Sequence, residues 1–206
     1  MLRTGSNDMG CARKPRIFWD LDDTLNNLMQ AWLSWRSVQG AAVVAYAELR
    51  ENPPHRLLGL TKASYLESLD CFRVSDEARH LKPIPAVMGW FAEWGSGFEH
   101  HVLTARPRVA VPAAADWVFT HFGQWVRHFH YTPARRDGEV LPDMDEDKGM
   151  VIRRLGGAEY FIDDDPKNLL VARAVVTSPL LVPQPWNEGT GSMSDVLAAL
   201  LSRANH

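Results

Sequence analysis

The sequence predicts an α/β fold in which helices cover both faces of a central parallel sheet. Short apolar runs that end in polar residues alternate along the chain with stretches whose apolar residues have helical spacing. The run Ile17-Phe18-Trp19 has no polar alternation, which is typical of a strand buried on both faces. The length of 206 residues suits one such domain with a modest insertion.

Composition and charge indicate a soluble globular protein with small partners. Hydrophobic residues make up 46% of the chain, and the net charge of −3 offers no positive surface for duplex nucleic acid or an anionic membrane. No apolar run approaches the ~20 residues of a membrane span, and residues 1–14 lack the apolar centre of a signal peptide. We expect a disordered N-terminal tail there. Cys11 and Cys71 suggest neither a disulfide framework nor a thiolate zinc site, so a reducing cytoplasm is the simplest location.

The first predicted strand ends in three carboxylates, Asp20, Asp22 and Asp23, followed by Thr24. Ligands bind at the carboxyl ends of strands in open α/β sheets, and Asp20 and Asp22 would point the same way if the extended backbone continued. One interpretation is an acidic turn in which Asp23 or Thr24 caps the next helix. Three adjacent like charges repel one another, however, and this favours a bound cation.

A helical insertion is predicted over residues 26–80. Its residues Leu28, Trp32, Trp35 and Val38 are three or four apart, as on one face of a helix. We expect helices at 26–39, 41–50 and 61–70, with Thr61 as the N-cap of the third. The run Lys82-Pro83-Ile84-Pro85 marks the return to the main domain, which comprises 15–25 and 81–206. The tryptophans either pack in a core or contact a ligand.

The rest of the chain alternates between helices and strands. Pro107 suits the first turn of a helix, which would place free N–H groups beside Thr104, and Asp165 is the expected cap of a helix that Pro166 opens. The predicted elements are helices at 86–94, 107–122, 147–155, from 166 and 192–202, and strands at 98–103, 125–131, 159–162 and 180–182.

Four polar features at strand ends or helix starts occur in order: Asp20 with Asp22, then Thr104, then Lys148, then Asp163 with Asp164. In type and order they resemble the four motifs of the haloacid dehalogenase (HAD) superfamily over residues 15–183. The resemblance implies a HAD-like Rossmannoid three-layer sandwich with a central parallel sheet and a small helical cap inserted after motif I. It also implies an enzyme, a phosphatase.

The predicted chemistry is phosphoryl transfer. Asp20 would attack phosphorus to form an aspartyl-phosphate, and Asp22 would protonate the leaving oxygen and later activate water. Thr104 and Ala105 would hold phosphate oxygens. Lys148 lies in the first turn of its helix, where the dipole disfavours a cation, so we expect it to face an anion, either phosphate or Asp20. The alternative is a solvated surface lysine.

Clustered carboxylates without a neutralising arginine cluster predict a requirement for Mg²⁺, which prefers oxygen ligands. The resemblance implies as ligands the Asp20 carboxylate, the Asp22 backbone carbonyl and one carboxylate of Asp163 or Asp164. The family's acid-x-Pro pattern favours Asp164, because Pro166 follows two residues later. His100, His101, His128 and His130 lack a His-Glu helix spacing, so we predict that they are structural or surface residues.

Within the superfamily the chain resembles the 5′(3′)-deoxyribonucleotidase-like group in the strings 103–107, 162–168 and 184–187, although Asp23-Thr24 stands where that group often carries Gly-Val. This implies a small phosphorylated substrate, preferably a nucleoside monophosphate. The alternatives are a phosphosugar or phosphoprotein phosphatase, or a catalytically silent binding protein. The candidate substrate contacts are Trp32, Trp35, Arg56 and Arg106.

Overall fold

The computed structural model describes residues 13–134, 136, 138, 140 and 147–204. Its centre is a parallel sheet of five strands in the order β3-β2-β1-β4-β5. The strands are β1 (Arg16–Trp19), β2 (Glu99–Thr104), β3 (Val126–Tyr131), β4 (Ala158–Asp163) and β5 (Val176–Leu181). In the register, Trp19 lies between Val102 and Ile162, so the carboxyl ends of β2, β1 and β4 meet at one edge of the sheet.

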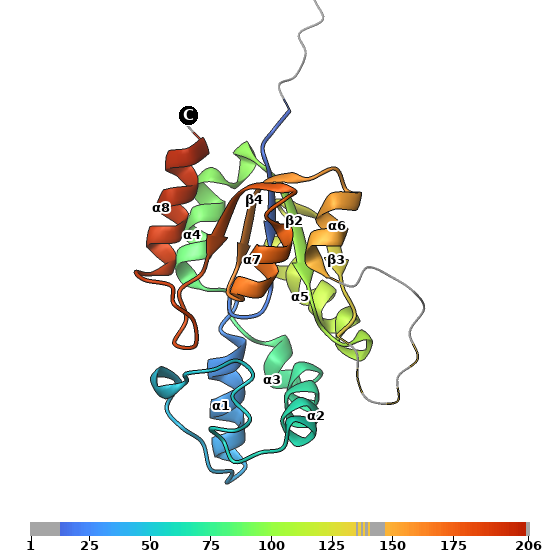
Figure 1. Ribbon diagram of the computed structural model, residues 1–206, viewed down its shortest axis with the longest axis vertical. Coiled ribbons are helices and arrows are strands. Elements are labelled where there is room, and N and C mark those ends of the chain that lie inside the picture. The colour runs from blue at the N-terminus through green and yellow to red at the C-terminus, as the bar shows by residue number, and fades with distance from the viewer. Residues whose placement is uncertain (1–12, 135, 137, 139, 141–146, 205–206) are drawn as a thin grey trace, which may run out of the picture.

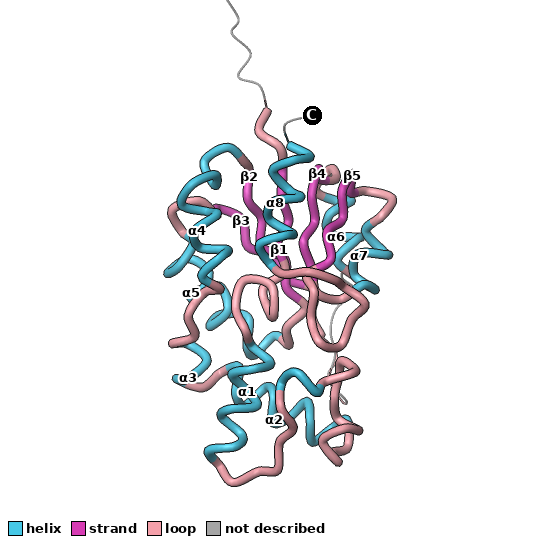
Figure 2. Tube along the Cα trace, turned by 90° about the vertical axis from the view of Figure 1, so that its left-hand side faces the viewer, coloured by secondary structure: helices cyan, strands magenta, loops and turns pink. Residues whose placement is uncertain are grey.

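Helices cover both faces of this sheet (Figure 2). The helices α4 (Pro85–Trp94), α5 (Val111–Phe122) and α8 (Met193–Ala204) pack on the face that carries Ile17 and Trp19. The helices α6 (Lys148–Arg154) and α7 (Pro166–Ala172) pack on the face that carries Phe18. Successive side chains of a strand point to opposite faces, so all three of these β1 residues are fully buried. The predicted α/β fold with a doubly covered parallel sheet is confirmed.

A separate group of helices lies beyond the end of the sheet (Figure 1). It contains α1 (Leu28–Val38), the 3₁₀ turn Tyr46–Glu48, α2 (Lys62–Arg73) and α3 (Asp76–Arg79). Its members have their own apolar core, in which Trp32, Leu69 and Phe72 are buried. We refer to residues 26–80 as the insertion.

The helix predicted at 41–50 is wrong. The structure has only the 3₁₀ turn there, flanked by Ala45 and Leu49 in extended conformations with ψ of 143° and 134°. Leu49 is the one buried residue of this stretch, so a helix would have no apolar face to pack. Most helix stability in proteins comes from packing such a face, and without it the segment remains irregular.

The N-termini of three helices test the predicted caps. Thr61 accepts a hydrogen bond from the Ser64 amide at 3.1 Å and Asp165 accepts one from the Lys167 amide at 2.9 Å, as predicted. Pro107, by contrast, is extended, and a 3₁₀ turn (Arg108–Ala110) precedes α5. Pro112 occupies the first turn of α5 instead, so the expected helix N–H groups beside Thr104 are not there.

The predicted disordered tail lies mostly outside the described residues, as does Cys11. Cys71 is an exposed free thiol on α2. Among the helices of the described part of the chain, none combines the length and the hydropathy that a bilayer span requires.

Candidate active site

The structure brings the predicted site residues to the carboxyl edge of the sheet. Asp20 directly follows β1, and its amide donates to the carbonyl of Ile162 on β4 at 2.8 Å. Thr104 and Asp163 are the last residues of β2 and β4, the two strands that flank β1. Parallel pairing thus converts three distant stretches of sequence into one cluster.

Lys148 joins two of the carboxylates. Its Nζ lies 2.6 Å from Asp20 Oδ1 and 2.7 Å from Asp163 Oδ2, and only 2% of its side chain is exposed. Burial alone would lower the pKa of Lys148, but the Asp163 and Asp20 carboxylates outweigh burial and raise it. Lys148 is therefore a buried cation that faces Asp20, rather than a solvated surface lysine.

Asp20 is a buried carboxylate. Burial raises the pKa of Asp20 to about 7, although the Lys148 ammonium opposes this shift. The neighbouring Asp163 and Asp22 charges act in the same direction as burial. A second cation in this site would favour the ionised form of Asp20.

The donor set fits a divalent cation with oxygen ligands. Asp20, Asp163 and Asp164 are all buried, and each offers a carboxylate oxygen within 4.8 Å of the others. With all three carboxyl groups ionised, their negative charge would exceed the one positive charge of Lys148 by two. Burial also raises the pKa of Asp164 well above its usual value, and the Asp163 and Asp20 charges add to this effect. A bound Mg²⁺ would relieve this repulsion.

Asp163 and Asp164 have different surroundings. Asp163 Oδ2 accepts from Lys148 and Asn168, and Oδ1 accepts from Asn168 and from the Asp165 amide at 2.8 Å. The Asp164 carboxylate accepts one hydrogen bond among the described residues, from Trp186 Nε1 at 3.1 Å. Asp164 thus keeps more free lone pairs than Asp163, which would suit it to bind a metal ion directly.

Two arginines neutralise Asp22. Arg106 donates to both carboxylate oxygens of Asp22, through Nε at 3.1 Å and through a shorter contact of Nη2, and Arg73 Nη2 donates at 3.1 Å. Burial would raise the pKa of Asp22, but the two guanidinium groups outweigh it and hold this pKa below its usual value. The prediction that no arginine cluster accompanies the acids is therefore wrong, because α2 brings Arg73 to the site.

Asp23 has a structural role that the sequence left open. It adopts a positive φ of 57°, and its Oδ1 accepts from the Met29 amide in the first turn of α1 at 3.0 Å. The predicted N-cap at Asp23 or Thr24 is wrong, because Asn27 is the N-cap of α1. Asp23 nevertheless satisfies one free amide of the first turn from outside the helix. Gln184 Nε2 donates to the Asp23 carbonyl at 2.6 Å, which ties the loop after β5 to the site.

A cavity of about 130 Å³ lies between the sheet edge and the insertion. It opens onto Asp20, Asp22, Thr104, Ala105 and Lys148, so every predicted catalytic and phosphate-binding residue lines it. The other lining residues are Asp23, Leu28, Met29, Asn52, Tyr65, Leu69, Arg73, Asp164, Asp165 and Asn168.

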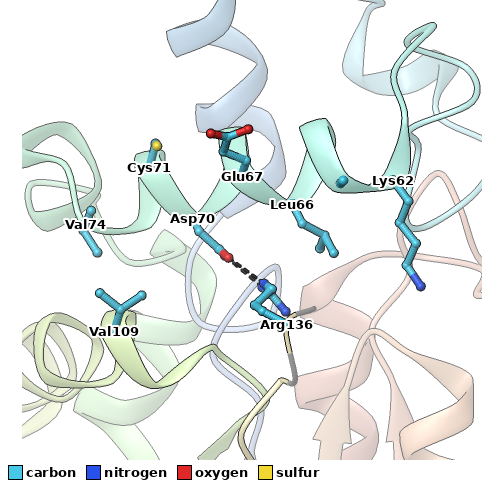
Figure 3. Close-up of a pocket in the computed structure, with 9 residues that line it drawn as sticks. Lys62, Leu66, Glu67, Asp70, Cys71, Val74, Val109 and Arg136 are labelled. Carbon is cyan, nitrogen blue, oxygen red and sulfur yellow. Dashed lines mark hydrogen bonds and ion pairs between the residues drawn. The ribbon is translucent and has the colours of Figure 1, made fainter. Parts of the chain in front are cut away.

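A second cavity of about 630 Å³ lies on another face of α2. In Figure 3, Asp70 points from α2 toward Arg136, whose Nε donates to Asp70 Oδ2 at 2.7 Å. Asp70 also accepts from Arg73 Nη1 at 3.1 Å, so a chain of ion pairs connects this cavity with Asp22. The two cavities share no lining residue, because α2 separates them.

Most predicted substrate contacts lie elsewhere. Trp32 is buried in the core of the insertion, where its Nε1 donates to Ser68 Oγ at 3.2 Å and its ring packs edge-on against Tyr65. Trp35 packs against Phe72, and Arg56 is exposed beside Glu51. None of the three predicted residues lines the 130 Å³ cavity. Arg106 reaches the site, but it binds Asp22 rather than lining the cavity.

We expect Trp32→Ala to act through stability. Removing a fully buried indole from a closed core costs ~3–5 kcal/mol of the free energy of unfolding. The melting temperature should therefore fall, and any catalytic activity should fall alike for every substrate measured near that temperature. A loss of activity toward one substrate at an unchanged melting temperature would contradict a packing role. Val38→Ala, at an exposed residue on α1, is the matched control.

Sequence reasoning missed several residues of the site. Arg73 lies 51 positions from its partner Asp22, and no motif marks it. Asn168 and Trp186 belong to strings that the sequence singled out only as resemblances. In the structure they bind Asp163 and Asp164, and Asn187 Nδ2 donates to the Asp164 carbonyl at 2.8 Å. The only sequence signal for these residues is that their strings resemble those that accompany the acidic motif in the family.

The five-stranded parallel sheet with its covering helices is similar to the fold of solved structures that are described as haloacid dehalogenase-like hydrolases. A hydrolase of that family from Streptococcus pneumoniae matches with a TM-score of 0.55 and 15% identity, over 90% of each chain. A protein from Thermotoga maritima, provisionally described as a β-phosphoglucomutase, matches with a TM-score of 0.55 and 13% identity, over 91% of this chain and 99% of its own.

A third solved structure, provisionally described as a phosphoglycolate phosphatase from Lactobacillus plantarum, matches with a TM-score of 0.53 and 13% identity. It covers 90% of this chain and 99% of its own length. No protein-family model matches the sequence, and neither does any curated protein. At these identities the structural matches establish the fold.

Proposed function

We propose that the protein is a Mg²⁺-dependent phosphomonoester hydrolase that works through an aspartyl-phosphate on Asp20. The observation that carries this proposal is the buried cluster of Asp20, Lys148, Asp163 and Asp164 at the carboxyl edge of β1 and β4. A nucleophile, a fixed cation and an excess of negative charge that suits a divalent ion occur together there. The neighbouring folds include proteins described as acting on phosphorylated small molecules.

In the first step, an Asp20 oxygen attacks phosphorus as the ester oxygen leaves, and Asp22 supplies the proton that this oxygen needs. In the second step, water attacks the phosphorus of the aspartyl-phosphate, Asp22 takes the proton, and phosphate and free Asp20 are released. Thr104 and Ala105 line the cavity where phosphoryl oxygens would lie. The Mg²⁺ would contribute charge neutralisation between Asp20, Asp164 and the phosphoryl group.

Asp22 requires a rearrangement before it can act as an acid. Arg106 and Arg73 hold it in the ionised form, which has no proton to give. A phosphate dianion entering the cavity would compete for the guanidinium groups, since both arginines bind carboxylate and phosphate with the same fork of donors. Loss of these contacts would raise the pKa of Asp22, so substrate binding itself would prepare the acid.

The cavity favours a compact leaving group, such as a phosphorylated sugar or carboxylic acid. Its volume of about 130 Å³ is well below the ~300 Å³ at which pockets for drug-sized ligands begin. The tryptophans that could have stacked on a base lie in the core of the insertion. A nucleoside monophosphate is the alternative, and it would require α2 to move away from the sheet edge.

Two other functions have less support. A phosphoprotein substrate would have to insert a phosphorylated side chain into a small cavity beneath the insertion. A catalytically silent binding protein would have no use for Asp22 and Lys148, yet both side chains are present and line the cavity.

The test is hydrolysis of p-nitrophenyl phosphate by the purified full-length protein. We expect turnover with Mg²⁺, loss of turnover in EDTA and recovery when excess Mg²⁺ is added, because the acidic cluster needs a cation to bind an anionic substrate. Undiminished hydrolysis in EDTA would overturn the metal assignment. A panel of sugar phosphates, phosphocarboxylates and nucleoside monophosphates would then rank the substrate classes by kcat/KM. No hydrolysis of any ester by folded, Mg²⁺-loaded protein would favour the silent binding protein.

A further inference from the structure

A cluster of histidines lies at the edge of the sheet, away from the candidate active site. The rings of His101, His128 and His130 stack on the face of β2 and β3 that carries Phe18, with His101 4.3 Å from His128 and 5.2 Å from His130 between ring centroids. Glu99 begins β2, whereas Thr104 ends it at the active site. The six residues of β2 span five steps, which place its two ends roughly 16 Å apart.

Three of these side chains turn a donor atom toward one point. His101 Nε2 lies 3.0 Å and His128 Nε2 4.0 Å from Glu99 Oε1, and the three ligand atoms lie within 4.8 Å of one another. Ligands at about 2.0–2.1 Å in a tetrahedral zinc site are separated by roughly 3.3–3.4 Å. Small rotations of the half-exposed His128 and of Glu99 would bring the donors to these separations.

Neighbouring residues orient two of the donors. Arg16 Nε binds Glu99 Oε2 at 3.3 Å, which leaves Oε1 directed at the histidines. In the metal-free protein His101 Nε2–H donates to Glu99 Oε1 at 3.0 Å. His130 Nε2 lies 3.0 Å from His101 Nδ1. On metal binding the ring proton of His101 would move to Nδ1, where His130 accepts it, and Nε2 would become a ligand. Such outer partners commonly orient metal-binding histidines.

The protonation of the cluster also suits a ligand role. Burial lowers the pKa of His101 to about 4, against a weaker opposite effect of Glu99, and burial also lowers the pKa of His130. Burial thus favours the neutral imidazole, which is the form that binds metals. Arg16 adds one positive charge nearby, which its ion pair with Glu99 balances.

We propose that Glu99, His101 and His128 form a second metal site, for Zn²⁺ or a similar transition-metal ion, with a fourth position open to water. Two imidazoles and one carboxylate suit such an ion better than Mg²⁺, which prefers oxygen ligands alone. Glu99 and His101 belong to β2, and His128 belongs to β3 at the edge of the sheet. The ion would therefore link the edge strand to its neighbour and stabilise the folded protein.

The experiment is thermal unfolding of the full-length protein in excess Mg²⁺, with and without ZnCl₂. We expect Zn²⁺ to raise the melting temperature by about 5 °C at concentrations near a hundred times its Kd. His128→Gln should abolish this rise, and His128→Cys should retain it because a thiolate also binds zinc. Both variants change a half-exposed side chain, so both should fold without metal.

His80→Gln is the matched control, because His80 is exposed and lies in the insertion. Isothermal titration with ZnCl₂, again in excess Mg²⁺ to occupy the acidic cluster, should find one binding site in the wild type and in His80→Gln that is missing in His128→Gln. Equal Zn²⁺ binding by His128→Gln and wild type would overturn the proposal, and so would the absence of any Zn²⁺ effect on the wild type. Hydrolysis of p-nitrophenyl phosphate with Mg²⁺ should be unchanged in His128→Gln, so the outcome is independent of the proposed phosphatase activity.

Discussion

Asp20→Asn should abolish hydrolysis of p-nitrophenyl phosphate while the protein remains folded. An amide cannot form the aspartyl-phosphate, and loss of a catalytic nucleophile lowers kcat by ~10⁴-fold or more. The fold should persist because Asn is nearly the same size and Lys148 keeps its second partner, Asp163, at 2.7 Å. The measurement is kcat at saturating Mg²⁺, together with the melting temperature.

The matched control is Asp116→Asn, at an exposed residue of α5. It should keep the activity of the wild type, since it changes the same charge far from the cavity. Residual turnover above ~1% in Asp20→Asn, with protein free of wild-type contamination, would show that another group attacks phosphorus. A loss of the folded state in Asp20→Asn would instead assign Asp20 mainly to the stability of the buried ion pairs.

The sheet could be predicted because its signals are local. The β1 residues Ile17, Phe18 and Trp19 are apolar in succession, since each contacts a covered face of the sheet. The alternation of strands and helices along the chain, with short connections between them, then predicts a parallel sheet. The carboxyl-edge position of Asp20 and Asp163 is a consequence of parallel pairing, so it could be predicted together with the strands.

The insertion was harder to predict because its signals depend on partners distant in sequence. Residues 41–50 contain good helix formers, but Leu49 alone is buried there, and propensity without packing does not hold a helix. The sequence left open whether Trp32 packs in a core or contacts a ligand. Its environment is decided by Tyr65 and Ser68 on α2, which the spacing within α1 does not reveal.

The charged residues of the site also divide into those with a local sequence signal and those whose contacts depend on the tertiary fold. The first-turn position of Lys148 indicated an anionic partner, which the structure identifies as Asp20 together with Asp163. The Arg73–Asp22 contact depends on how α2 docks over the sheet edge, and a single sequence carries no record of it. The meeting of Glu99 with His128 likewise depends on the register of β2 and β3.

Lys148→Met should be the most destabilising substitution in the site. It removes the one ammonium that pairs with Asp20 and Asp163, and an uncompensated buried charge costs ~3–5 kcal/mol of the free energy of unfolding. Turnover should fall as well, because the carboxylates would repel the phosphate. Lys167→Met, at an exposed residue of α7, is the control and should change stability by less than ~0.5 kcal/mol.

The loss of unfolding free energy in Lys148→Met should depend on pH, and the direction of this dependence identifies its cause. Burial already raises the pKa of Asp20 to about 7 in the folded protein, and loss of Lys148 removes the main force opposing that shift. A carboxyl whose pKa is raised by folding stabilises the fold while it is protonated, and this contribution is lost as the pH rises through the folded pKa. Urea unfolding should therefore show a larger deficit at pH 8 than at pH 5, and Mg²⁺ should reduce it at pH 8 by supplying the missing positive charge. A deficit that is equal at both pH values would indicate lost packing of the lysine side chain rather than lost charge.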